Sequence, residues 1–217
     1  MSVNRLRIAG AIAVFMLVSW TASLRMAQHW DREATVWLQQ SAPAFDLAAG
    51  VLVFLGNAEV VIPCILLASG IVFFRSRNNA VSGLWLAAGI AIAGLMAVAL
   101  KYFVVHPGPP EAFQRPRLNA GLSVPTPYSY PSGHTLRTTI LAWTVLRRVP
   151  WLAGLFVLAM MMALVYLGDH WMSDVLGGLC LGWVAFEIAA ALRVYPKRAR
   201  PIRNNGAGPK SLDRAWH

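Results

Sequence analysis

The sequence predicts an all-α integral membrane protein, a bundle of six transmembrane helices. Of its 217 residues, 57% are hydrophobic and only 13% are charged, and the mean hydropathy is +0.54, which is too apolar for a soluble domain of this size. The apolar residues also gather in six runs of about 20 residues, the length that crosses a bilayer as a helix with its backbone hydrogen bonds satisfied internally. These runs cover residues 8–27, 48–74, 81–104, 133–148, 150–168 and 172–193.

The first run could alternatively be a signal peptide, because Arg5 and Arg7 precede it and small residues follow. At about 20 residues it is long for the apolar part of a signal peptide, so we interpret it as a retained span. After it, the segment from Trp30 to Leu38 mixes aromatic and apolar residues with charged ones. This composition predicts a helix that lies in the headgroup plane and anchors the chain.

The fourth and fifth runs meet at Val149-Pro150 and could form one long kinked helix. That arrangement would leave Arg147 and Arg148 in the middle of the membrane, where an arginine is costly. We therefore predict a turn between two shorter helices.

Basic residues set the predicted orientation. With the N-terminus inside, most of the 19 lysines and arginines fall in inner segments, so both termini are expected to be cytoplasmic. The tail 195–217 is basic and interrupted by prolines, which predicts a disordered cytoplasmic segment behind a single transmembrane domain, residues 1–194. The net charge of +10 lies in clusters between apolar runs, not along one face, so no nucleic-acid partner is expected. Four outer-side basic residues gather in or beside one loop, which suggests an anionic ligand: Lys101, Arg115, Arg117 and Arg137.

Residues with catalytic chemistry converge on the same outer side. Lys101 lies near the end of the third run, Ser132, Gly133 and His134 lie at the start of the fourth, and His170 and Asp174 lie at the start of the last. The i, i+4 spacing lets the Asp174 carboxylate bind one imidazole nitrogen of His170 and leave the other free to attack. Backbone N–H groups at Ser132-Gly133, with the positive end of the helix dipole, suit a phosphate.

Together these motifs resemble the type 2 phosphatidic acid phosphatase superfamily, from Lys101 to Asp174: a lysine, then Pro-Ser-Gly-His, then His followed four residues on by Asp. The resemblance implies a metal-independent enzyme without a cofactor. In it, His170 would be phosphorylated, Asp174 would orient it and His134 would protonate the leaving alkoxide.

Two arginines of the family pattern are absent. Where Arg-Pro is usual the chain has Gly108-Pro109, and where Ser-Arg is usual it has Ala163-Leu164. Since such arginines hold phosphate oxygens, substitutes are needed. Our hypothesis is that Arg137, one turn after His134 on the same helix face, and Arg115 replace them, with Arg117 a weaker candidate.

Other polar and aromatic residues have several interpretations. For His106, interfacial packing is favoured over phosphate contact, and for Asp169 a solvated loop charge is favoured. Asn57 and Glu59 are unusual inside an apolar run; Glu59 would either pair with Arg137 or line the cavity. Two groups have simpler readings: an aromatic belt at the pocket mouth (Tyr128, Tyr130 and Trp171) and close helix packing (Gly177, Gly178 and Gly182).

The expected function is hydrolysis of a lipid phosphate monoester or a polyprenyl pyrophosphate at the outer membrane interface. Phosphatidic acid, phosphatidylglycerol phosphate and undecaprenyl pyrophosphate are candidate substrates, and the family resemblance suggests a bacterial inner membrane with the site facing the periplasm. The alternatives are a lipid-phosphate binder or transporter that has lost catalysis, and a phosphotransferase that uses the same phosphoenzyme. Besides a lipid phosphate and membrane lipids, the sequence indicates no partner, and it does not reveal the oligomeric state.

Overall fold

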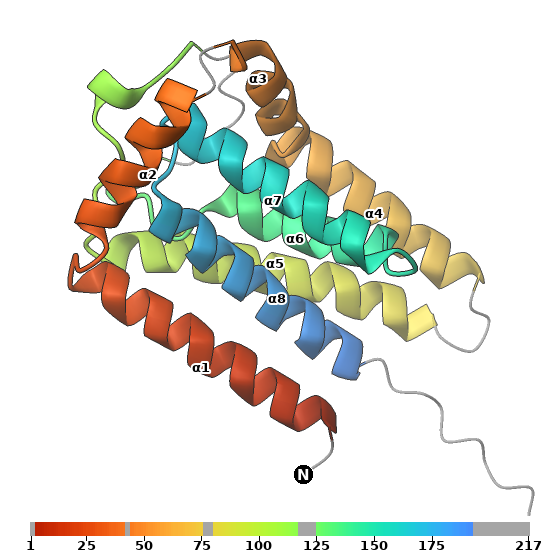
Figure 1. The fold of residues 1–217 in the computed structure, drawn as a ribbon. Coiled ribbons are helices and arrows are strands. Elements are labelled where there is room, and N and C mark those ends of the chain that lie inside the picture. Colours follow the sequence, from red (N-terminus) through yellow and green to blue (C-terminus); the bar gives the residue numbers. More distant parts are fainter. Residues whose placement is uncertain (1–2, 42–43, 76–79, 117–124, 193–217) are drawn as a thin grey trace, which may run out of the picture.

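The computed structural model describes residues 3–41, 44–75, 80–116 and 125–192, and every regular element in these ranges is helical, as the sequence predicts (Figure 1). The elements are α1 Val3–Ser23, α2 Gln28–Ser41, α3 Asp46–Leu55, α4 Ala58–Arg75, α5 Ala80–Phe103, the short 3-10 helix η1 Glu111–Phe113, α6 Gly133–Val145, α7 Pro150–Tyr166 and α8 Met172–Leu192. The tail 195–217 and Arg117 lie outside the described residues.

The turn predicted between the fourth and fifth runs is confirmed. Helix α6 ends at Val145, and α7 begins at Pro150, where proline is favoured because the first helical N–H has no partner to lose. Arg147 and Arg148 lie in this turn with exposed side chains. The chain thereby avoids placing two guanidinium groups among the packed helices.

The single helix expected over 48–74 is wrong, because the structure divides it into α3 and α4, which meet at 45°. Gly56 and Asn57 lie at the break. The carbonyl of Gly56 accepts a hydrogen bond of 3.3 Å from Arg137, and the side chain of Asn57 binds His134 at 2.8 Å. In a continuous helix the Gly56 carbonyl and the Asn57 side chain would point in other directions. The break between α3 and α4 is therefore needed for these contacts with Arg137 and His134.

Helix α8 is the centre of the bundle and packs against α1, α2, α5, α6 and α7 (Figure 1). Its close approach to α6 depends on glycine. A Cβ atom at Gly178 would collide with the backbone oxygen of Ser132, and one at Gly182 would lie 2.9 Å from the backbone oxygen of Leu136. A Cβ atom at Gly177 would collide with the ring of Tyr130. The predicted close packing at these three glycines is confirmed.

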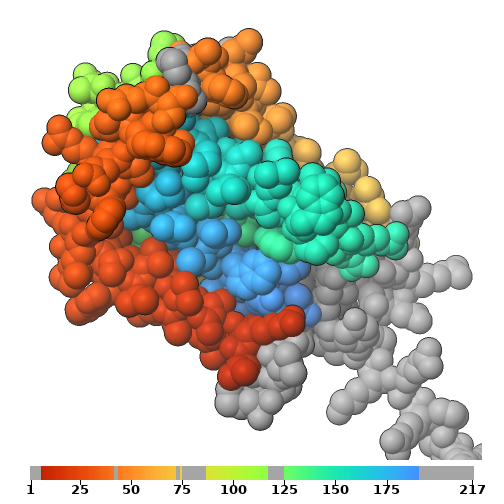
Figure 2. Space-filling view, viewed as in Figure 1, coloured from red at the N-terminus to blue at the C-terminus, as the bar shows by residue number. Residues whose placement is uncertain are grey.

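Helix α2 crosses the end of the bundle at which α8 begins, and Figure 2 shows it covering that end of the molecule. It contacts α7 and α8. Its inner face is polar, with Asp31 and Thr35 buried, whereas Trp30 and Trp37 are exposed on its surface. Outward indoles suit the headgroup region, where an amphipathic ring is favoured, but placement in that plane stays a prediction.

Two described helices are long and apolar enough to cross a membrane, over Leu6–Ser23 and Met172–Ala190. The bent pair of α3 and α4 adds a third if it is counted as one span, and Ala87–Phe103 and Pro150–Tyr166 are shorter apolar helices. Large hydrophobic side chains such as Leu67, Phe74 and Leu95 are exposed along the bundle, which suits lipid contact. The total of six spans and the orientation of the termini stay predictions.

Candidate active site

The start of α8 joins His170 to Asp174 as the sequence predicts. Nδ1 of His170 lies 3.3 Å from Oδ2 of Asp174, and the backbone N–H of Trp171 donates to the same oxygen at 3.0 Å. Asp174 is fully buried, whereas the His170 side chain keeps 13% of its surface exposed. A carboxylate held in this way fixes the orientation of the imidazole and leaves its Nε2 available for another partner.

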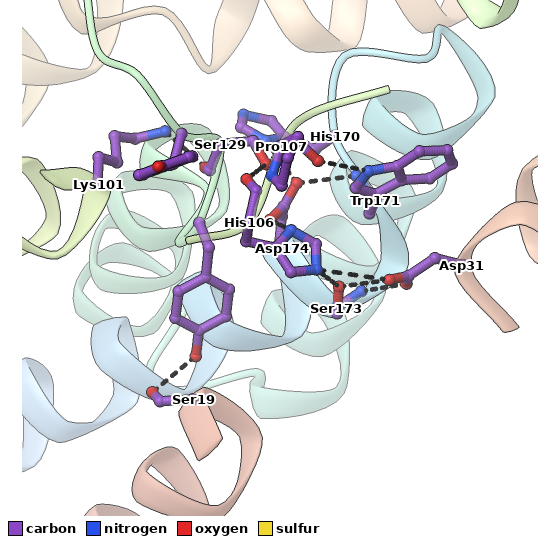
Figure 3. Close-up of polar contacts among 12 residues, drawn as sticks. Ser19, Asp31, Lys101, His106, Pro107, Ser129, His170, Trp171, Ser173 and Asp174 are labelled. Atoms are coloured by element: carbon purple, nitrogen blue, oxygen red, sulfur yellow. Dashed lines mark hydrogen bonds and ion pairs between the residues drawn. The ribbon is translucent and has the colours of Figure 1, made fainter. Parts of the chain in front are cut away.

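His106 contacts the other oxygen of the same carboxylate, so the interfacial role expected for it is wrong. Its Nδ1 lies 3.2 Å from Oδ1 of Asp174, and its side chain is almost completely buried. Figure 3 shows Asp174 between the imidazole rings of His170 and His106. The physical reason is the burial of Asp174, because each oxygen of a buried carboxylate requires a polar or charged neighbour.

Asp31 extends this cluster to α2. Its carboxylate accepts hydrogen bonds from the backbone N–H of Ser173 at 2.8 Å and from the Ser173 hydroxyl at 2.7 Å. Burial raises the pKa of Asp31, while its Ser173 hydrogen bonds and the nearby His106 act in the opposite direction. No sequence pattern indicates this role, because Asp31 resembles an ordinary charge of an interfacial helix.

The start of α6 is fixed to the start of α8 through Ser132. The Ser132 hydroxyl caps α6 by accepting from the backbone N–H of Thr135 at 3.4 Å, and its own N–H donates to the backbone oxygen of Asp174 at 3.0 Å. Ser132 is fully buried, so it positions the helix terminus. The first turn of α6, with Gly133 and His134, then presents its N–H groups and the positive end of the helix dipole beside α8.

His134 is held by a residue that the sequence analysis noted only as unusual. Nε2 of His134 donates a hydrogen bond of 2.8 Å to Oδ1 of Asn57, which is buried at the break between α3 and α4. An asparagine inside an apolar run indicates a required polar contact, but it does not identify the partner.

Arg137 and Lys101 supply positive charge beside His134. Arg137 donates through Nη2 to the carbonyl of Gly56 at 3.3 Å and interacts electrostatically with Glu59. Its Nε is buried and has no hydrogen-bond partner among the described residues. Lys101 donates to the carbonyl of Ser129 at 2.6 Å and lies near enough to Asp174 and Arg137 for electrostatic interaction. Two cations therefore line the same cavity as His134.

A cavity of about 700 Å³ opens among α4, α5 and α6. One end is polar and includes Lys101, Gly133, His134 and Arg137. The rest is lined almost entirely by apolar side chains of the three helices, among them Ile62, Ile65, Leu66, Ile90, Leu95 and Val98. A molecule with a small anionic head and a long apolar tail matches both parts.

Arg115 is engaged elsewhere. Its Nη1 forms an ion pair of 2.7 Å with Asp46 and donates to the Tyr166 hydroxyl at 2.9 Å, and its guanidinium lies 4.7 Å from the centre of the Tyr166 ring. The backbone N–H of Arg115 donates to the carbonyl of Leu167 at 3.0 Å, which turns its side chain toward α3. None of these partners belongs to the group around His170, so the structure does not bring Arg115 into the site.

Two of the aromatic and acidic expectations need correction. Tyr130 is fully buried beneath the site and hydrogen-bonded to Ser19 of α1 at 2.8 Å, so it is not part of a belt at the mouth. Trp171 and Tyr128 are half-buried, and the Trp171 indole donates to the carbonyl of Pro107 at 2.9 Å. Asp169 is half-buried and interacts with other residues, which differs from the solvated charge expected.

Comparison with known proteins gives consistent findings. A family model described as the PAP2 superfamily matches residues 82–199. The chain is 33% identical over 150 residues to an undecaprenyl-diphosphatase of Sulfolobus acidocaldarius, which covers 63% of this chain and 67% of that protein. It is 25% identical over 195 residues to phosphatidylglycerophosphatase B of Bacillus subtilis, covering 83% of this chain and 90% of that protein.

A solved structure has the same fold. The crystal structure of a transmembrane PAP2 type phosphatidylglycerolphosphate phosphatase from Bacillus subtilis superimposes with a TM-score of 0.70 and covers 89% of this chain and 99% of that chain. The two sequences are 21% identical in this comparison, so the likeness shows the fold alone.

Proposed function

The chain belongs to the PAP2 superfamily, and from this we propose that it is a membrane lipid phosphatase that works through a phosphohistidine at His170. The observation that carries the proposal is the two-part cavity. Its polar end combines His134 with two cations, and its remaining wall is apolar. A soluble phosphate ester would have no use for the apolar part, whereas a lipid phosphate uses both.

In the first step, Nε2 of His170 attacks phosphorus, and the bond from phosphorus to the leaving oxygen breaks. His134 gives its proton to that oxygen, so that an alcohol, or a lipid monophosphate from a pyrophosphate, departs. Asp174 holds the Nδ1 proton of His170 and balances the positive charge that the ring gains.

In the second step, a water molecule attacks the phosphohistidine. His134, now without its proton, takes one from that water, the phosphorus–nitrogen bond breaks, and inorganic phosphate leaves. Both steps place negative charge on the phosphoryl oxygens. Lys101, Arg137 and the first turn of α6 at Gly133 are the groups available to stabilise it.

Arg137 is the substitute for the missing family arginines that the geometry favours. It lines the cavity together with His134, is half-buried, and has a buried Nε without a hydrogen-bond partner among the described residues. A half-buried guanidinium whose Nε donor is unused is suited to a phosphate oxygen. Its hydrogen bond to the carbonyl of Gly56, at the break between α3 and α4, orients the planar guanidinium.

The substrate class follows from the cavity and from the names of the relatives, an undecaprenyl-diphosphatase and a phosphatidylglycerophosphatase. We propose that a polyprenyl diphosphate or a phospholipid monophosphate places its chain between α4 and α5 and its headgroup at the start of α6. The lipid reaches the site from the bilayer, at the outer face of a bacterial inner membrane in a six-span topology.

The test is phosphate release by the purified full chain in the presence of a chelator, with phosphatidic acid, phosphatidylglycerol phosphate and undecaprenyl pyrophosphate as substrates and His170→Ala as control. We expect release from at least one lipid, inhibition by vanadate, and a trapped phosphohistidine that the variant lacks. Binding of the lipids without release would support a binder or transporter instead. Transfer of phosphate to a second lipid, without net release, would support a phosphotransferase.

A further inference from the structure

The two histidines around Asp174 form one buried cluster, but only His170 is placed to meet a substrate. Oδ2 of Asp174 is occupied by His170 and by the N–H of Trp171. Oδ1 faces Nδ1 of His106 at 3.2 Å, a close contact without the alignment of a hydrogen bond, and neither atom has a hydrogen-bond partner among the described residues. Since a carboxylate oxygen carries only lone pairs, a ring nitrogen without a hydrogen would repel it at this distance, so the contact favours a hydrogen on Nδ1 of His106.

The opposite nitrogen of His106 faces a hydroxyl whose hydrogen is already used. Nε2 of His106 lies 3.2 Å from Oγ of Ser173, and this hydroxyl donates to Oδ2 of Asp31 at 2.7 Å. A serine has one hydroxyl hydrogen, so toward His106 it acts as an acceptor. The hydrogen bonds therefore require a hydrogen on Nε2 as well.

Charge leads to the same conclusion. Asp174 approaches His106 from α8, and Asp31 approaches from α2 with Oδ2 3.8 Å from Nε2. The third titratable neighbour is the Tyr130 phenol, whose ring centre lies 6.1 Å from that of His106, and burial raises its pKa, so it stays neutral. Two carboxylates and one imidazolium leave this cluster with less uncompensated charge than any neutral form of His106 would.

On the basis of the proposed phosphohistidine mechanism, we propose that His106 is a doubly protonated positioning residue that holds Asp174 in place for His170, and that Asp31 of α2 holds His106 (Figure 3). His106 does not contact the substrate. It stabilises the ionised, correctly oriented Asp174, and α2 thereby becomes part of the catalytic apparatus as well as a cover over the end of the bundle.

The kinetic test measures three variants: His106→Gln, Asp31→Asn, and the double variant that combines these two changes. The control is Ser69→Ala, which alters a buried residue of α4 outside the site. The amide of glutamine can still donate a hydrogen bond but carries no charge. We expect kcat to fall about 10- to 100-fold in His106→Gln with KM changed by less than about three-fold, the size expected for losing a charged hydrogen bond. The double variant should be no slower than His106→Gln, because both changes break the same chain of contacts.

A direct test of protonation does not depend on activity. In protein labelled with ¹⁵N-histidine, both His106 nitrogens of the wild type should show the chemical shifts of protonated imidazolium at neutral pH, with the signals identified by their absence in His106→Gln. If His106→Gln does not fold, the His106 signals are identified as those that change in Asp31→Asn. The kcat of Asp31→Asn then serves as the kinetic test.

The outcomes separate this inference from the proposed function. A His106→Gln enzyme with kcat within about three-fold of wild type, an additive double variant, or one unprotonated nitrogen on His106 would overturn the inference. If the wild type releases no phosphate from any lipid and forms no phosphohistidine, the proposed function fails. The ¹⁵N spectrum then decides alone whether His106 is the cation that holds Asp174.

Discussion

Replacing Asn57 by alanine should slow the chemical step while leaving the bundle intact. Asn57 is buried at the break between α3 and α4, and its side-chain oxygen receives the Nε2 hydrogen of His134 at 2.8 Å. This contact joins the second apolar run to the start of α6. Alanine at position 57 removes the acceptor and frees the imidazole to rotate away from the leaving oxygen.

The size of the effect follows from the burial of the contact. Asn57 is fully buried and His134 is half-buried, so losing their hydrogen bond costs about 1–3 kcal/mol. If that cost falls on the transition state, in which His134 must be oriented for proton transfer, kcat decreases by about 5- to 150-fold. The affinity for the lipid should change little, because the apolar part of the cavity does not include Asn57.

The assay is steady-state phosphate release with the best lipid of the panel, together with a thermal unfolding curve. Asn57→Asp keeps an oxygen acceptor at the same place and should retain more activity than Asn57→Ala. Ser69→Ala is the matched control, since the buried hydroxyl of Ser69 on α4 has no hydrogen-bond partner among the described residues. Equal kcat values for Asn57→Ala and Ser69→Ala would refute the reasoning that Asn57 orients His134.

Other predictions address packing, phosphate contact and pH. Gly178→Ala should destabilise the protein by about 1–3 kcal/mol, seen as a lower Tm, because its Cβ would meet backbone, whereas Gly154→Ala, with open space around it, should not. Arg137→Ala should lower kcat/KM at least about 100-fold, and Arg137→Lys should restore only part of the activity; wild-type rates in both variants would contradict this assignment. Arg115→Ala should keep kcat within about three-fold of wild type and lower the free energy of unfolding by about 1 kcal/mol or less, because its ion pair is partly exposed. Because burial raises the pKa of Asp31, its carboxyl gains a proton at a higher pH than an ordinary aspartate does on acidification. The ratio of wild-type to Asp31→Asn activity should therefore be largest at neutral pH and fall toward one as the pH decreases through that pKa; a pH-independent ratio would argue against it.

The sequence alone was sufficient wherever the relevant geometry is local. The i, i+4 spacing of His170 and Asp174 predicts their contact because residues at this separation share one face of a helix, and the structure contains it. In the same way, the runs that begin at Gly133 and Pro150 predict where α6 and α7 start. The all-helical fold follows equally from the lengths of the apolar runs.

Only the tertiary structure decided which distant residues meet. His106 on Asp174, Asn57 on His134 and Asp31 on Ser173 join segments far apart in the chain. Arg115 is the opposite case: it lies in the loop where a phosphate-binding arginine is predicted, but its side chain pairs with Asp46 of α3. A polar residue in an apolar run indicates that a polar partner is required, because burying a polar group without a partner is costly. Which partner it finds depends on how the helices pack, and that arrangement is set by side chains along every helix, so no single spacing in the sequence encodes it.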